Sequence, residues 1–234
     1  MKTKRLVFCL LIYLTLHLTP TRAADERCLP ISQSEITAQI AQLPISSPKQ
    51  IVILLRARHS NLLDTAYNQY TLLWEKTPKD PYVNLLRGLS AECFFEDSMD
   101  LRIQPLYNLH SSRTDLFSVA HSCLKTASEG APKFAEAKME YGYYLWQFGS
   151  ETEQGLTLLI EAAKLAPSDP RIHATLGLVY SNQTGNVYSM HQAIAELKCA
   201  AQLDPTYAYP HAMLADIYRW QHQSSLSQQE RLIY

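Results

Sequence analysis

The sequence predicts an all-α protein, an α-solenoid of about four to five helix-turn-helix hairpins. Residues 135–167 and 170–205 repeat one pattern: a first helix with a glycine among apolar and aromatic residues, then a second helix with small residues and a closing proline. A pattern that recurs at a fixed period is typical of helical arrays. Only seven glycines occur in 234 residues, and few runs alternate apolar and polar residues, which argues against a sheet protein.

The chain begins with the order of residues that is typical of a secretory signal. Three basic residues precede an apolar run over residues 6–18, and small residues follow up to Ala23. The apolar run has 13 residues, whereas a helix that crosses a bilayer needs about 20. We therefore expect residues 1–23 to be a cleaved export peptide, no stable membrane span after cleavage, and a periplasmic or extracellular mature protein.

Cleavage would also change the charge of the chain. Residues 1–23 hold four positive charges and no acidic residue, so the net charge would move from −1 to −5. A protein that binds nucleic acid through its phosphates normally presents a basic face. The acidic balance of the mature chain therefore argues against nucleic acid as a partner.

The first helix after this leader is expected in the N-terminal segment, residues 24–46. Ser32 stands three residues before Glu35, a spacing that is typical of a capping box, and apolar residues recur at helical spacing until Pro44. We expect this short helix to pack on the first hairpin.

The first hairpin is expected in residues 47–80. Pro48 can open its first helix, because proline suits the first helical turn. Asn61 can cap a second helix that runs to about Thr77, ahead of Pro78.

The prolines that close the second helices set the length of each repeat. They are spaced by 54, 35 and 38 residues: Pro78, Pro132, Pro167 and Pro205. One interval therefore carries about 20 extra residues, as expected for an insertion in a loop. The repeat domain spans residues 47–234, with approximate repeats 47–80, 81–134, 135–169, 170–207 and 208–234.

The insertion interrupts the second repeat. We place it at residues 96–113, after a helix that runs from Pro81 to about Phe95 and before one that runs from about Thr114 to Ser128. Long loops of this kind are often functional, which makes the insertion a candidate site.

Two spacings recur in the hairpins. A Leu-Gly or Leu-Ala pair is followed three residues later by tyrosine in residues 176–180 and 214–218. Two small residues seven apart are followed five later by proline in residues 120–132 and 193–205. This combination resembles the tetratricopeptide repeat family, and the resemblance covers nearly all of residues 48–221.

The resemblance implies a concave groove, lined by the first helices, that binds an extended or helical segment of a partner protein. Carried onto the matching positions, it assigns eleven residues to this groove: Met139, Tyr143, Trp146, Gln147, Arg171, Leu178, Asn182, Tyr209, Asp216, Arg219 and Trp220. Aromatic residues and arginines dominate the binding energy of protein interfaces. For Trp146 and Trp220 the alternative is that they pack against neighbouring helices.

We therefore expect an exported scaffold or adaptor that binds a protein or peptide, has no enzymatic activity and needs no cofactor or metal. The sequence has no paired metal-binding motif and no phosphate loop. One alternative is an enzyme or enzyme subunit that uses acid–base groups at the insertion: Glu96, Asp97, Asp100 and His110. The other is a structural spacer that associates with itself through the C-terminal repeat, which lacks a closing proline.

Four cysteines remain after the leader: Cys28, Cys93, Cys123 and Cys199. Disulfides persist outside the cytoplasm, so these residues can pair. Cys93 and Cys123 are expected on the two helices of one repeat, which makes them the preferred pair. The alternative is that all four are small buried apolar groups.

Overall fold

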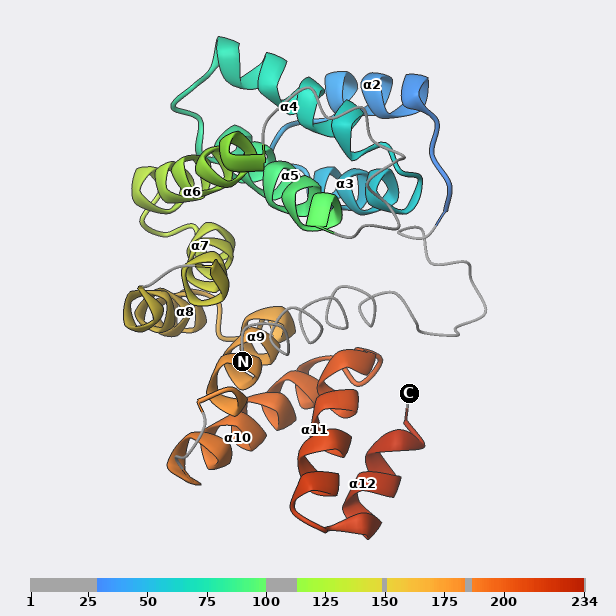
Figure 1. The fold of residues 1–234 in the computed structure, drawn as a ribbon, viewed down its shortest axis with the longest axis vertical. Coiled ribbons are helices and arrows are strands. Elements are labelled where there is room, and N and C mark those ends of the chain that lie inside the picture. Colours follow the sequence, from blue (N-terminus) through green and yellow to red (C-terminus); the bar gives the residue numbers. More distant parts are fainter. Residues whose placement is uncertain (1–28, 100–112, 149–150, 184–186, 234) are drawn as a thin grey trace. The chain divides into compact units, whose positions relative to one another are not determined.

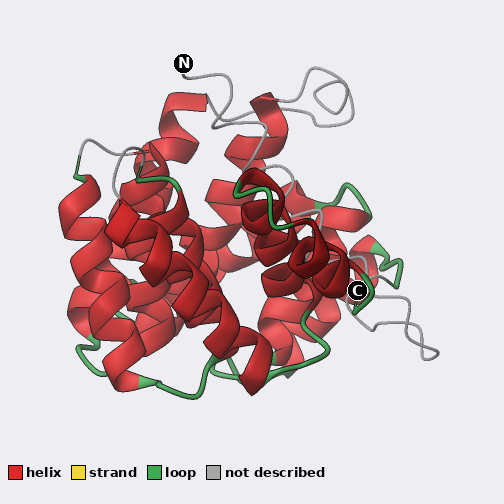
Figure 2. Ribbon diagram, turned by 90° about the horizontal axis from the view of Figure 1, so that it is seen from below, coloured by secondary structure: helices red, strands yellow, loops and turns green. Residues whose placement is uncertain are grey.

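The computed structural model describes residues 29–99, 113–148, 151–183 and 187–233. These residues form helices joined by loops and contain no strand (Figures 1 and 2), which confirms the expected all-α helical-repeat class. None of these helices combines the length and apolar character that crossing a membrane requires. The expected export peptide lies outside the described residues, as do Asp100 and His110 of the insertion.

Contacts divide the chain into two units, which we describe separately. The N-terminal unit ends at Tyr141 and the C-terminal unit begins at Gly142, so helix α7 contributes to both. The N-terminal unit contains α2 (Gln33–Gln42), α3 (Lys49–His59), α4 (Leu63–Lys76), α5 (Pro81–Met99), α6 (Arg113–Gly130) and the first half of α7 (Ala135–Phe148). The C-terminal unit contains the rest of α7, α8 (Thr152–Leu165), α9 (Pro170–Ser181), α10 (Val187–Leu203), α11 (Ala208–Trp220) and α12 (Ser224–Arg231).

The short helix α2 begins as the sequence predicts. The Oγ of Ser32 accepts a hydrogen bond from the amide of Glu35 at 3.2 Å. This bond satisfies one of the amides that the first turn of a helix leaves without a partner. Ile36 and Ile40 are buried, and α2 packs on α3 and α4, the two helices of the first hairpin.

Asn61 does not cap α4, contrary to the expectation. It has a φ of 56° in the turn between α3 and α4, and α4 starts two residues later, at Leu63, without a side-chain cap. Asparagine tolerates this left-handed region better than most residues because its short side chain can bond locally. Asn61 therefore turns the chain between the two helices.

Helix α5 is longer than the sequence predicts. Its expected end is Phe95, whereas the helix continues to Met99. Glu96 and Asp97 are therefore helical residues, and Arg58 of α3 pairs with both. Local periodicity contains no information about such a long-range ion pair, which explains the misplaced helix end.

Helices α5 and α6 cross at Gly88. A Cβ atom at this position would lie 2.8 Å from Cγ of Leu124, closer than real side chains pack. The glycine therefore lets the leucine of α6 sit against the backbone of α5.

The crossing of α7 and α8 is tighter, because two glycines face each other. A Cβ atom at Gly142 would lie 2.7 Å from the carbonyl oxygen of Gly155, and one at Gly155 would lie 2.5 Å from that of Gly142. Backbone meets backbone here, so neither position has room for a side chain. At the α9–α10 crossing the nearest neighbour of Gly177 is again a leucine side chain, that of Leu197.

A histidine and a glutamate join the two helices of each of the last two hairpins. Nδ1 of His173, the fourth residue of α9, lies 2.7 Å from Oε2 of Glu196 on α10. Nδ1 of His211, the fourth residue of α11, lies 2.7 Å from Oε2 of Glu230 on α12. The same bond in two successive repeats holds each first helix on its second helix.

The expected disulfide between Cys93 and Cys123 is not formed. Both side chains are buried, but no bond joins them. The sulfur of Cys123 lies 3.4 Å from Nη1 of Arg87, whose guanidinium stands 4.2 Å from the ring centroid of Trp74. Arg87 precedes Cys93 by six residues on α5, which corresponds to about 9 Å along a helix. Leu124, next to Cys123, packs against Gly88, five residues before Cys93, so Cys123 faces a different turn of α5 from the one that carries Cys93.

Candidate functional site

The residues that the resemblance assigns to a groove differ in burial. Met139 of the N-terminal unit is buried, and so are Tyr143, Leu178 and Tyr209 of the C-terminal unit. Each of the four is at most 7% exposed. Their burial assigns them a role in helix packing, and a role in binding stays a prediction for them.

Trp146 and Gln147 follow in the last turns of α7 and are partly exposed. The ring centroids of Trp146 and Tyr143 lie 5.7 Å apart, with the ring planes tilted by 32°. Aromatic rings at this separation attract each other beyond the effect of buried area. The buried tyrosine therefore supports a tryptophan that still presents part of its surface.

Arg171 and Asn182 lie at opposite ends of α9, and each forms hydrogen bonds with a residue nearby in the sequence. Asp169, the N-cap of α9, accepts a hydrogen bond from the amide of Arg171 and pairs with its guanidinium, both at 2.9 Å. Burial opposes the charged form of Asp169, but the hydrogen bonds and charge of Arg171 outweigh it and hold the pKa of Asp169 below its usual value. Nδ2 of Asn182 donates to the carbonyl oxygen of Leu178 at 2.9 Å. Both polar groups are thus held in fixed positions while they remain partly exposed.

Trp220, the last residue of α11, is 82% exposed, so it does not pack against a neighbouring helix. Arg219 beside it is also exposed, and its Nη2 lies 3.0 Å from Oδ1 of Asp216. Trp and Arg are the residue types most enriched among positions that dominate binding energy. These residues form the most accessible part of the predicted groove set.

The N-terminal unit carries an acidic cluster, Glu92, Glu96, Asp97 and Glu140, around Arg58. Nη2 of Arg58 on α3 lies 2.9 Å from Oδ1 of Asp97, and its Nη1 lies 3.4 Å from Oε2 of Glu96. These three side chains are 7 to 15% exposed, so water screens their charges only weakly. Two of the acid–base groups in the enzyme alternative are thus engaged in ion pairs.

Glu92 is the most deeply buried member of the acidic cluster. It is 1% exposed, and neither of its carboxylate oxygens has a hydrogen-bond partner. Burial raises its pKa well above the usual range, and the charges of Glu96 and of Glu140 on α7 raise it further, whereas Arg58 opposes them. Buried carboxylates normally have donors, and a strongly shifted pKa is common at functional positions.

The other reactive side chains of the described residues show no metal-binding arrangement. No group of three or more His, Cys, Asp or Glu side chains within the described ranges is placed to hold a metal ion. Burial raises the pKa of Cys123 and of Cys199, which keeps both thiols protonated. Lys125, one turn after Ser122, lies 3.9 Å from Glu129 with about half of its side chain exposed.

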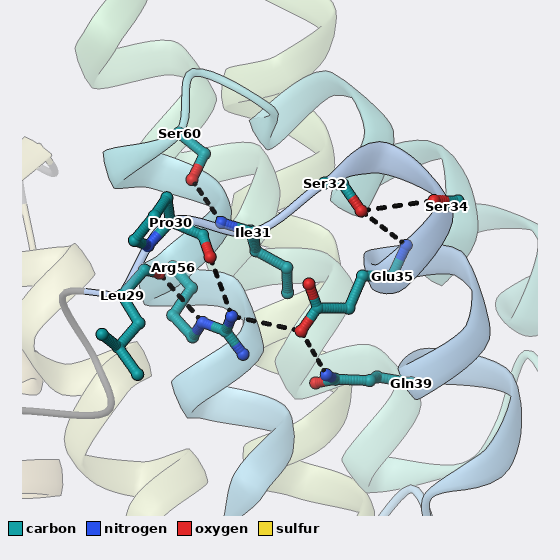
Figure 3. Close-up of polar contacts among 9 residues, drawn as sticks. All are labelled: Leu29, Pro30, Ile31, Ser32, Ser34, Glu35, Gln39, Arg56 and Ser60. Carbon is teal, nitrogen blue, oxygen red and sulfur yellow. Dashed lines mark hydrogen bonds and ion pairs between the residues drawn. The ribbon is translucent and has the colours of Figure 1, made fainter.

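Arg56 of α3 holds the segment that precedes α2 (Figure 3). Its guanidinium donates to the carbonyl oxygens of Leu29 and Pro30, each at 3.0 Å, and pairs with Glu35 at 3.2 Å. The amide that follows Pro30 donates to Oγ of Ser60, also at 3.0 Å. These bonds fix the N-terminal segment on the first hairpin, and we assign them a structural role.

The sequence analysis missed Glu92, Arg58 and Glu140 as functional candidates. The only local signal is a glutamate inside the mostly apolar stretch 89–95 of a first helix. An acidic residue in such a stretch is unusual, because burial of an ionised carboxylate is costly.

Comparison with known proteins extends the picture of the fold. No family model matches the sequence, and no curated protein matches it. A thermophilic TPR protein of Thermus thermophilus matches in structure with a TM-score of 0.58 at 15% identity, covering 92% of this chain and 99% of that one. The chain has the tetratricopeptide repeat (TPR) fold.

Two structures of MamA show the same TPR-like architecture. The crystal structure of MamA has a TM-score of 0.52 at 17% identity, and covers 76% of this chain and 90% of MamA. A MamA RS-1 ArsTM double mutant has the same TM-score at 16% identity, and covers 80% of this chain and 93% of the mutant. At these identities the similarity concerns the fold, so the function has to be argued from the residues.

Proposed function

We propose that this protein is an exported scaffold without enzymatic activity that binds a segment of another protein on its first helices. The observation that carries the proposal is the exposure of Trp220 at the end of a first helix, beside the exposed Arg219. A tryptophan in water leaves a large apolar surface available, and its burial by a partner is favourable. The TPR fold is compatible with this role, and the leader-like residues 1–23 support export.

The polar groups of the C-terminal unit suit such binding because they are already ordered. Asp169 fixes Arg171 and a main-chain carbonyl fixes Asn182, while the exposed Arg219 pairs with Asp216. An arginine carries five N–H donors, so one that holds a carboxylate can still donate to a partner. Side chains that are ordered in advance lose less conformational entropy when a partner binds.

Selection of peptides from a random library on the purified full chain provides a ligand with which to test the proposal. The test variant combines four alanine substitutions at exposed or partly exposed first-helix positions: Trp146→Ala, Arg171→Ala, Arg219→Ala and Trp220→Ala. Tyr143 stays in place, because alanine at this buried position would also loosen the packing. We expect at least a tenfold loss of affinity with little change in melting temperature.

The matched control places four alanine substitutions on exposed second-helix positions of the same unit: Leu165→Ala, His191→Ala, Lys198→Ala and Leu203→Ala. This variant should bind the selected peptide as tightly as the wild-type chain. A library that yields no binding peptide, or equal losses in both variants, would contradict the proposal.

Export has its own test. Sequencing of the N-terminus of the protein recovered from cells that express it should give a chain that begins after Ala23. A mature chain that still begins at Met1 would refute export and leave the binding role untouched.

Self-association is a second candidate function, and exposed apolar residues of the last hairpin support it. In the last hairpin Leu232 is 81% and Ile233 is 56% exposed, which leaves apolar surface available for a second copy. Sedimentation velocity tests it: serine at both positions should convert an associated wild-type chain to a monomer, and a monomeric wild type at micromolar concentration would exclude it.

A further inference from the structure

A cavity of about 190 Å³ lies between α2 and α3 of the N-terminal unit. None of the residues that line it belongs to the predicted groove set or to the acidic cluster. On α3 the lining residues Lys49, Val52 and Arg56 follow each other at helical spacing, so they share one face of the helix. Since a cavity of about 150 Å³ holds a benzene molecule, this one has room for a small organic ligand.

The residues that line the cavity range from buried to exposed. Ile53 and Arg56 are 1% and 8% exposed, whereas Gln42 and Lys49 are exposed side chains. Val52 lies between these extremes and is partly exposed. The cavity therefore extends from a buried floor to the surface, and a ligand can enter past Gln42 and Lys49.

Arg56 presents a donor to this cavity that the protein does not use. Its Nε and Nη2 donate to two main-chain carbonyls and to Glu35, whereas its Nη1 has no bond to any described residue (Figure 3). Nε2 of Gln39, which also lines the cavity, donates to the same oxygen of Glu35 at 2.8 Å. The guanidinium is thus fixed by its other bonds, and the N–H groups of Nη1 remain available to a ligand.

The charges at the cavity favour a ligand with one negative charge. Two of the lining residues, Lys49 and Arg56, are basic, and none is acidic. Glu35 pairs with Arg56 and offsets one of the two positive charges. The side chains of Lys49 and Gln42 make no bond within the part of the chain that the structure describes, so both can donate to an anion.

The apolar part of the lining distinguishes between anions. Leu43, Val52 and Ile53 contribute aliphatic surface to the cavity. An inorganic phosphate or sulfate would place polar oxygens against this surface, which is unfavourable. An aliphatic group gains affinity there, because it leaves water for an apolar contact.

We propose that the cavity between α2 and α3 binds a small aliphatic monocarboxylate. Its carboxylate accepts from Nη1 of Arg56, and its hydrocarbon part lies against Leu43, Val52 and Ile53. Lys49 and Gln42 hold the entrance. This ligand site goes beyond the scaffold function and does not depend on it, because no groove position takes part.

The first experiment is a titration of the purified full chain with acetate, butanoate and pentanoate, followed by ligand-observed NMR. The affinity should rise about threefold for each added methylene group, since each one buries more apolar surface. Pentanamide keeps the shape of pentanoate and removes the charge, so it should bind about tenfold more weakly.

The second experiment repeats the titration with variants of the lining. Lys49→Met should weaken pentanoate about threefold, because the lysine is exposed and water screens its charge. Val52→Phe fills the cavity without changing its charge, and it should weaken pentanoate about tenfold. Arg56 stays in place, since it also holds residues 29 and 30. The control Lys76→Met removes an exposed lysine of α4 that does not line the cavity and should leave the affinity unchanged.

Four results would overturn the inference. These are the absence of saturable binding of pentanoate, equal affinities of pentanoate and pentanamide, equal affinities of the wild type and both lining variants, and tighter binding of inorganic phosphate than of pentanoate. The last result would identify a general anion site. Peptide selection on the same chain is a separate measurement, so each of these failures leaves the scaffold function standing.

Discussion

Polar contacts connect different parts of the array in the two units. In the N-terminal unit, polar contacts of Arg58 and Arg87 join successive hairpins: Arg58 of α3 pairs with α5, and Arg87 of α5 donates to Thr71 of α4, in addition to its contact with Cys123 of its own hairpin. In the C-terminal unit the described bonds of His173 and His211 to glutamates lie within a hairpin.

The difference shows that polar contacts can stabilise one fold either within a hairpin or between successive hairpins. Bonds within a hairpin make each repeat a stable piece, and contacts between repeats can then be largely apolar. Bonds between hairpins fix how successive first helices stand to each other, so they also fix any surface that these helices share. The acidic cluster of the N-terminal unit is such a shared surface, because α3, α5 and α7 all contribute to it.

The largest expected effect is a loss of stability from a substitution at the α7–α8 crossing of the C-terminal unit. Gly142→Leu places a side chain where the backbone of Gly155 lies, and we expect it to lower the free energy of unfolding by about 3 kcal/mol. Gly88→Leu in the N-terminal unit should cost about 1–2 kcal/mol, because the side chain of Leu124 can move. Urea denaturation followed by circular dichroism measures both, and equal losses would show that the two crossings are packed alike.

A somewhat smaller effect is expected from the contact between hairpins. Arg58→Met removes a cation that pairs with the largely buried carboxylates of Glu96 and Asp97, and we expect a loss of about 2–3 kcal/mol. Hydrogen exchange should locate the loss in α3 and α5. If the loss is below about 0.5 kcal/mol, the ion pairs do not couple the hairpins.

One carboxyl group in each unit, Glu92 and Asp169, should make stability depend on pH, with opposite signs. The raised pKa of Glu92 means that its contribution is most favourable below the usual glutamate pKa of about 4.3 and is lost as the pH rises. Glu92→Gln should therefore gain stability relative to the wild type as the pH rises from 4 to 8, because glutamine does not ionise.

Asp169 provides the opposite case within the same prediction. Its lowered pKa gives a contribution that is present above the usual aspartate pKa of about 3.9 and is lost as the pH falls. Asp169→Asn should therefore lose stability at neutral pH and approach the wild type near pH 3. Urea denaturation at four pH values checks both variants, and parallel curves would contradict the difference between the units.

The smallest effect is expected at an exposed pair of the C-terminal unit. Arg219→Met removes an ion pair with Asp216 that water screens, and we expect a change of about 0.5 kcal/mol or less. Thermal denaturation measures it, with Arg58→Met as the comparison. A loss equal to that of Arg58→Met would mean that exposure does not separate the two pairs.

The sequence predicts those features that local pattern determines. Ser32 caps α2 as expected, because a capping box involves only residues of one turn. Asn61 shows the limit of such reasoning, since the same residue type serves both as a helix cap and in a left-handed turn. The choice between them depends on how two helices meet, which a local pattern does not contain.

The candidate sites show the same limit. The exposure of Trp220 excludes the alternative that it packs against a neighbouring helix, and its assignment to the groove stays a prediction. Glu92, Arg58 and Glu140 are far apart in the sequence, and their meeting depends on the rotation of three helices. A shift of one residue turns a helical position by about 100°, so small errors in register hide a cluster of this kind.

The clamp formed by Arg56 has a consequence for proteolysis. Its two main-chain acceptors are the carbonyls of Leu29 and Pro30. Carbonyl groups are present whatever side chains the segment carries, so these two bonds of the clamp do not depend on the sequence of the segment. A peptidase binds its substrate as an extended strand and needs these same carbonyl groups. Removal of residues beyond position 28 would thus require the clamp to open first, and the folded protein itself would define where trimming stops.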